Sequence, residues 1–74
     1  MDKPLLNSFM AKHSDTQETL ADAMGLSLSR FNAKVNERDG AAFTQNEMQF
    51  IIDRYSLSND DAINIFFSPK LPTT

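Results

Sequence analysis

The chain has 74 residues, a formal net charge of −3 and no cysteine. A chain of this length buries one modest core, so we expect a single domain, and without thiols it has neither disulfides nor thiolate metal sites to stabilise it. The segment 1–9 lacks a basic start followed by a long apolar run, which argues against a signal peptide or membrane span and favours a cytoplasmic protein.

Apolar residues at helical spacing begin near the start of the chain. Pro4 suits the first turn of a helix, where the N–H that proline lacks would have no partner within the helix. The polar residues His13 and Ser14 interrupt the spacing. We therefore expect a first helix between these points, whose apolar side consists of Leu5, Leu6, Phe9 and Met10.

Two short helices separated by a tight turn are predicted next. Asp15 or Thr16 can cap the second helix, and Gly25 ends it by accepting a left-handed conformation. Ser27 is a good N-cap for the third helix, which extends to about Asn36. The apolar residues of the pair are Leu20, Ala21, Met24, Leu26, Phe31 and Val35.

A loop and a fourth helix follow. The segment 37–43 contains an Asp-Gly pair and is typical of a loop, with Phe43 placed to pack back as a hydrophobic staple. Thr44 and Glu47 stand in the spacing of a capping box, which predicts a helix starting at Thr44. Its buried side is expected to consist of Met48, Ile51, Ile52 and Tyr55.

A fifth helix is predicted by the same signal. Ser58 and Asp61 repeat the cap, and acidic side chains favour the positive end of the helix dipole. This helix should end at Pro69. Its apolar residues are Ile63, Phe66 and Phe67. We therefore predict an all-α domain over residues 1–68, followed by a short tail over residues 69–74.

Charge is distributed unevenly along the chain. The net negative charge speaks against nucleic-acid binding, because phosphate contacts usually require a basic face. The acidic excess, however, lies in the C-terminal half, whereas Arg30, Lys34 and Arg38 gather in the middle. A molecule that is acidic overall can thus keep one surface that attracts DNA.

The third helix is expected to turn one side toward the core and the other toward solvent. The helix before it must cross it closely, which the small residues Ala21 and Gly25 permit. If Phe31 and Val35 face inward, the opposite side is free to enter a groove. That outward side carries Leu28, Ser29, Asn32, Ala33 and Asn36.

Several short matches to one family occur in order over roughly residues 5–67. They are Thr16-Gln17, Leu20-Ala21, Gly25-Leu26-Ser27, Phe31, Lys34-Val35-Asn36, Phe43-Thr44 with Glu47, and Ile63 with Phe66-Phe67. The set resembles the helix-turn-helix of bacteriophage repressor and Cro-type regulators, and in particular a branch of small phage regulators from Gram-positive hosts. The resemblance implies a compact five-helix domain of the lambda-repressor-like DNA-binding type, in which the second and third helices form the helix-turn-helix.

The resemblance, together with the basic residues beside the turn, implies a set of DNA contacts. Base edges would be read by Gln17, Ser27, Leu28, Ser29, Asn32 and Ala33. The DNA backbone would be contacted by Thr16, Arg30, Lys34, Asn36, Arg38 and Thr44. Asn32 could bridge adenine, and Leu28 or Ala33 could lie against a thymine methyl group, so we expect a half-site rich in A·T pairs.

The same residues have structural explanations that need no DNA. The polar residues among them can form a solvent-exposed face, and Arg30 and Lys34 can form a solvated face near Glu37. Leu28 can equally be a core residue or part of a protein interface.

The sequence thus favours a phage-type transcriptional regulator that binds operator DNA as a dimer, in the cytoplasm and at the nucleoid of a bacterial host. Its two half-sites would lie about one helical turn apart. The alternative is a protein-interaction module, such as an antirepressor or a regulator's partner, that uses the acidic C-terminal face or exposed Phe66 and Phe67. The net charge favours this alternative.

Catalysis and cofactors are not expected. His13 stands beside Ser14 and Asp15, but neighbours at a helix end point in different directions and do not assemble a catalytic triad. A surface or helix-terminal histidine is the better interpretation. With one histidine and no cysteine, a transition-metal site is not expected either.

Overall fold

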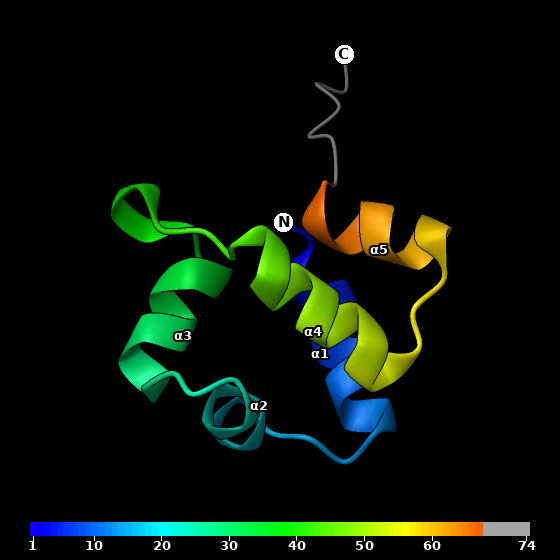
Figure 1. Ribbon diagram of the computed structural model, residues 1–74, viewed down its shortest axis with the longest axis horizontal. Helices are drawn as coiled ribbons and strands as arrows, with labels where there is room; N and C mark the ends of the chain where they lie inside the picture. The colour runs from blue at the N-terminus through cyan, green and yellow to red at the C-terminus, as the bar shows by residue number, and fades with distance from the viewer. Residues whose placement is uncertain (68–74) are drawn as a thin grey trace.

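The computed structural model describes residues 1–67, which form five α-helices, one short 3-10 turn and no β-strand. The helices are α1 (Lys3–Lys12), α2 (Gln17–Ala23), α3 (Leu28–Val35), α4 (Gln45–Tyr55) and α5 (Asn59–Phe66), and the 3-10 turn is Arg38–Gly40. Figure 1 shows α2 and α3 on one side of the molecule and α5 on the opposite side. The all-α class is confirmed, while the predicted tail and the helix end at Pro69 lie outside the described residues.

Every α-helix begins with a polar N-cap whose side chain accepts a hydrogen bond from a backbone N–H three residues later. The caps are Asp2, Thr16, Ser27, Thr44 and Ser58. Thr44 and Glu47 form the capping box expected from their spacing, because the Glu47 carboxylate also accepts the Thr44 N–H at 2.9 Å. Thr16 is one of the two caps predicted for the second helix, and it also forms a capping box with Thr19 that was not predicted. The Asp2 cap of α1 was not predicted either.

Residues 24–27 connect α2 to α3 in a turn that is fixed by its own hydrogen bonds. Gly25 has φ +73°, so the predicted left-handed end of α2 is confirmed. The N–H of Gly25 donates to the carbonyl of Asp22 at 3.0 Å, and the N–H of Leu26 donates to that of Ala21 at 2.9 Å. These two bonds make a Schellman motif, which stops α2 and sets the direction in which α3 leaves.

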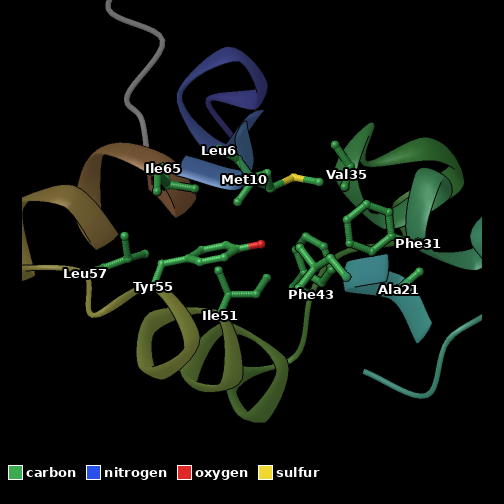
Figure 2. Packing of buried hydrophobic residues seen from close by; sticks show 11 residues of the cluster. Leu6, Met10, Ala21, Phe31, Val35, Phe43, Ile51, Tyr55, Leu57 and Ile65 are labelled. Atoms are coloured by element: carbon green, nitrogen blue, oxygen red, sulfur yellow. The ribbon is translucent and has the colours of Figure 1, made fainter. Parts of the chain in front are cut away.

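One buried apolar cluster joins all five helices (Figure 2). It consists of Leu6, Met10, Leu20, Ala21, Phe31, Val35, Phe43, Ile51, Tyr55, Leu57 and Ile65. The rings of Phe31 and Phe43 lie 5.7 Å apart, and Phe43 meets Phe66 edge-on at 6.4 Å. Aromatic contacts of this kind add to the apolar burial. They hold α3, the α3–α4 loop and α5 together.

The buried side of α5 is centred on Ile65, a residue that was not among the apolar residues named for this helix from the sequence. Ile65 is fully buried, whereas Ile63 is 52% exposed and Phe67 is 65% exposed. Helical spacing alone cannot decide between the two apolar sides of this helix. Packing of α1 against α5 determines which side is buried. The N–H of Asp2, the N-cap of α1, donates to the Ile65 carbonyl at 2.7 Å.

Asp15 ties the α1–α2 loop to the end of α4. Its carboxylate accepts hydrogen bonds from Arg54 Nε at 2.8 Å and Nη2 at 3.0 Å, and from the Tyr55 hydroxyl at 2.7 Å. The Arg54 guanidinium and the Tyr55 hydroxyl hold the pKa of Asp15 well below its usual range. Burial of the phenol, with its bond to Asp15, raises the pKa of Tyr55. His13 is exposed at the end of α1, as predicted, and its ring lies 4.9 Å from that of Tyr55.

Candidate nucleic-acid interface

The N-terminal half of α3 presents a short ridge to solvent. The ridge consists of the exposed residues Ser27, Leu28, Ser29 and Arg30, with Asn32 and Ala33 half-buried behind them. Leu28 is 41% exposed, which excludes the alternative that it is a core residue. On the other side of the helix Phe31 and Val35 are buried, as predicted, and these contacts anchor the ridge.

An acidic hollow of about 420 Å³ lies on one flank of the ridge, between α2 and α3. Ser27 and Leu28 line it from the ridge, while Glu18 and Asp22 line it from α2. Both carboxylate residues are exposed. Because they repel anions, a phosphate group would be disfavoured on this flank. Neither residue was among the site residues predicted from the sequence.

The start of α2 carries Thr16 and Gln17, two of the predicted contact residues. The Thr16 hydroxyl already serves the capping box and accepts the Thr19 N–H at 3.1 Å. Gln17 is half-buried, and its side chain makes no hydrogen bond within residues 1–67. Its amide is therefore free for a partner outside the chain.

The three cations expected at the DNA backbone differ in what they contact. Lys34 is half-buried, and its Nζ donates to Glu47 at 2.8 Å. Its acidic partner is thus Glu47 on α4, not the Glu37 that is closer in sequence. Within residues 1–67 the exposed side chains of Arg30 and Arg38 form neither hydrogen bonds nor ion pairs. These two guanidinium groups remain available to an anion.

The Lys34–Glu47 ion pair links α3 to the start of α4. Burial alone would raise the pKa of Glu47, but the bonds from Lys34 and from the Thr44 N–H bring it below its ordinary value. Thr44 itself is exposed, and its hydroxyl accepts the Glu47 N–H at 3.1 Å. Because it joins the two helices on either side, this ion pair restrains the α3–α4 loop, which carries Arg38. Between that loop and α3 lies a second hollow of about 380 Å³, lined in part by Arg30 and Lys34.

Asn36 is the C-cap of α3, and each polar atom of its exposed side chain makes a hydrogen bond within the protein. Its Nδ2 donates to the Asn32 carbonyl at 2.9 Å, and its Oδ1 accepts from Lys3 Nζ at 3.0 Å. Lys3 is therefore a cation near the end of α3 that was not among the predicted site residues. Its link spans 33 residues of chain, so no local pattern indicates it.

The described residues show neither a metal cluster nor a membrane span. Within residues 1–67 there is no group of three or more potential metal-ligating side chains, and no helix there is long and apolar enough to cross a bilayer. Comparisons with protein-family models, with curated proteins and with solved structures find no match for this chain. What the ridge does must therefore be inferred from its own geometry and chemistry.

Proposed function

We propose that this protein is a sequence-specific, double-stranded DNA-binding regulator of the phage repressor and Cro type. In this proposal α2 and α3 form a helix-turn-helix, and α3 enters the major groove. The exposed ridge on the N-terminal half of α3 carries the proposal, because recognition helices contact base edges with their N-terminal residues. The ordered resemblance of short segments within roughly residues 5–67 to such regulators also favours it.

Base contacts fall to the ridge and to Gln17. Asn32 has the amide that pairs with adenine in the major groove, and Ser29 can donate to or accept from several bases. Leu28 offers an exposed apolar side chain to a thymine methyl group. The expected half-site is therefore rich in A·T pairs.

In this proposal, DNA phosphates contact the side of the ridge that faces the α3–α4 loop. Arg30 and Arg38 have free guanidinium groups there. Lys34 instead pairs with Glu47 and positions the loop. Two phosphate contacts per copy give a slope of log affinity against log salt of about −2. Counting Lys34 as a third contact, as the sequence suggests, gives about −3.

The test of base reading is selection from a random duplex pool at about 50 mM salt, followed by binding measured by fluorescence anisotropy. Asn32→Ala should weaken binding to the selected duplex by about tenfold and relax the preference at one position. Asn64→Ala, an exposed asparagine on α5, is the matched control and should change nothing. Recovery of no duplex by the folded protein would refute the proposal.

The test of the phosphate contacts is the salt slope. Arg30→Ala and Arg38→Ala should each reduce its magnitude by about one. Lys12→Ala removes an exposed cation from the end of α1 and serves as the control. A slope unchanged in both arginine variants would mean that the DNA lies elsewhere on the protein.

The second candidate function is that of a protein-interaction module. The exposed apolar side chains of Ile63 and Phe67 favour it, as does the net charge. It predicts that the folded protein binds no duplex even at low salt. The selection experiment therefore decides between the two candidates.

A further inference from the structure

The hollow between α4 and α5 is an apolar surface that the DNA-binding proposal leaves unused. It measures about 560 Å³, and the more than half-exposed side chains of Ile63 and Phe67 lie on it. Exposed apolar patches with a polar rim are typical of interaction sites on soluble domains. The apolar lining consists of Met48, Ile52, Ala62, Ile63, Phe66 and Phe67, and three uncharged amide side chains complete it.

Exposed carboxylates adjoin this hollow on both helices. On α4, Asp53 follows the lining residue Gln49 by four positions, and Gln49 Nε2 donates to its carboxylate at 2.9 Å. On α5, Asp60 precedes the lining residue Ile63 by three positions. Residues at these spacings are neighbours on a helix surface. Asp53 and Asp60 therefore form an acidic rim on the two sides of the apolar lining.

Within α4 and α5 no free cation offsets the acidic rim. The two helices contain a single cation, Arg54, and its guanidinium is bonded to Asp15. Asp60 and its half-buried neighbour Asp61 have side chains that form neither hydrogen bonds nor ion pairs within the described part of the chain. The hollow thus combines an apolar lining with a negative charge that is not compensated.

We propose that the α4–α5 hollow is the docking site for a basic amphipathic helix of a partner protein. The apolar side of that helix would occupy the lining, and its flanking lysine or arginine side chains would lie against Asp53 and Asp60. A helix is favoured over an extended segment because residues 1–67 contain no β-strand whose edge could be extended. A third helix can instead pack into the groove between two others.

The acidic rim disfavours the other occupants of an apolar hollow. A second copy of this chain would bring the same carboxylates face to face, which costs free energy in a twofold pair. Nucleic acids and anionic membrane surfaces are repelled for the same reason. A cationic segment with an apolar side is attracted by both the lining and the rim.

This inference goes beyond the proposed DNA binding and does not depend on it. Figure 1 shows α5 on the side of the molecule opposite α2 and α3, so a helix docked on α5 leaves the ridge exposed. The docking is measured without DNA, because a basic peptide binds duplex by itself.

The size of the hollow sets the expected strength. Nine residues line it, whereas a standard stable interface uses about 20 to 30 residues a side. We therefore expect a Kd on the order of tens to hundreds of micromolar. Because exposed ion pairs contribute modestly, each rim carboxylate should account for about a two- to threefold change in Kd.

Three synthetic peptides of about 15 residues test the proposal, since shorter helices are marginal in water. The first has leucines on one side of a helix and lysines beside them. The second carries glutamates in place of the lysines, and the third carries serines in place of the leucines. Amide chemical shifts of the full chain should change on α4 and α5 with the first peptide. The other two should bind at least about tenfold more weakly.

Variants of the protein locate the binding and identify its cause. Asp53→Asn with Asp60→Asn should weaken the basic peptide by about three- to tenfold and reduce the effect of added salt. Glu18→Gln with Asp22→Asn removes the same charge from α2 and is the matched control, which should change the Kd by less than about twofold. Ile63→Ser removes an exposed apolar side chain from the lining and should weaken binding by about fivefold.

The outcomes separate this inference from the proposed function. It is overturned if millimolar basic peptide shifts no amide on α4 or α5, or if the acidic peptide binds equally well. It is also overturned if the two double variants weaken binding equally, or if copies of the chain pair through the hollow and exclude the peptide. Binding of the basic peptide on α4 and α5 by a protein that binds no duplex supports the inference and refutes the DNA-binding proposal.

Discussion

Replacing Asp15 by alanine should remove the main polar link between the α1–α2 loop and α4. The Asp15 side chain is only 9% exposed and accepts bonds from Arg54, the Tyr55 hydroxyl and Thr19. Hydrogen bonds to a charged group contribute about 1.5–3 kcal/mol each, and an unpaired buried hydroxyl costs about 1–3 kcal/mol. Arg54 is about one-third exposed, so its share is reduced by solvent screening.

We expect Asp15→Ala to lower the free energy of unfolding by about 2–4 kcal/mol, and the Tm by about 10–25 °C for a domain of this size. Urea and thermal unfolding followed by far-UV circular dichroism measure both quantities. Asp53→Ala is the control, because Asp53 is exposed and bonds only to Gln49. If Asp15→Ala is as stable as this control, the link contributes nothing to stability.

The same link makes stability depend on pH. The pKa of Asp15 lies well below the ordinary value of 3.8 in the folded protein, so folding favours the ionised form. The stabilisation is therefore complete above about pH 4 and is lost as the pH falls toward the folded-state pKa. The difference in unfolding free energy between wild type and Asp15→Ala should shrink steadily below about pH 4.

Gly25→Ala should lower the free energy of unfolding by about 1 kcal/mol, as measured by urea unfolding. The loss comes from backbone strain alone, because φ is +73° and an added Cβ meets no atom within 4 Å. A double-mutant cycle on Lys34 and Glu47, whose side chains are 13% and 19% exposed, should give a coupling energy of about 1–2 kcal/mol. A value near zero would contradict a stabilising link between α3 and α4. Ile65→Ala should lower stability by about 2–5 kcal/mol, whereas Ile63→Ala should change it by less than about 0.5 kcal/mol; the reverse order would contradict the orientation of α5.

Local signals predicted the helix boundaries well, because caps and turns are made within a few residues of chain. The side chains of Ser27, Thr44 and Ser58 each bond to an N–H three residues away, and Gly25 closes α2 by hydrogen bonds to the helix it ends. Such patterns can be read directly from sequence spacing. The number and order of helices follow from them together with the apolar periodicity.

Partners that are distant in sequence could not be predicted. Lys34 has Glu37 three residues away, yet it bonds to Glu47 thirteen residues away, because the start of α4 folds back onto α3. Asp15 and Arg54 are 39 residues apart, and nothing local indicates their contact. The candidate site is affected in the same way: the ridge was predicted from periodicity, but which of its neighbouring cations stay free depends on the tertiary fold.

Net charge is a poor guide to this surface, because nearby unpaired charges act on a ligand more strongly than charges that are distant, paired or screened. The carboxylates of Glu18 and Asp22 lie beside the ridge on the α2 flank, opposite the free guanidinium groups. If α3 enters the major groove, these carboxylates oppose the approach of DNA. The double substitution Glu18→Gln and Asp22→Asn should then raise duplex affinity severalfold at low salt.

That gain should fade as salt rises, because screening weakens the repulsion that the substitutions remove. Asp53→Asn with Asp60→Asn removes the same charge from the α4–α5 side and is the matched control. A general effect of net charge would raise affinity equally in both pairs, whereas binding through the ridge requires a larger gain from the α2 pair. Equal gains in the two variants, measured by anisotropy across a salt series, would place the duplex away from α3.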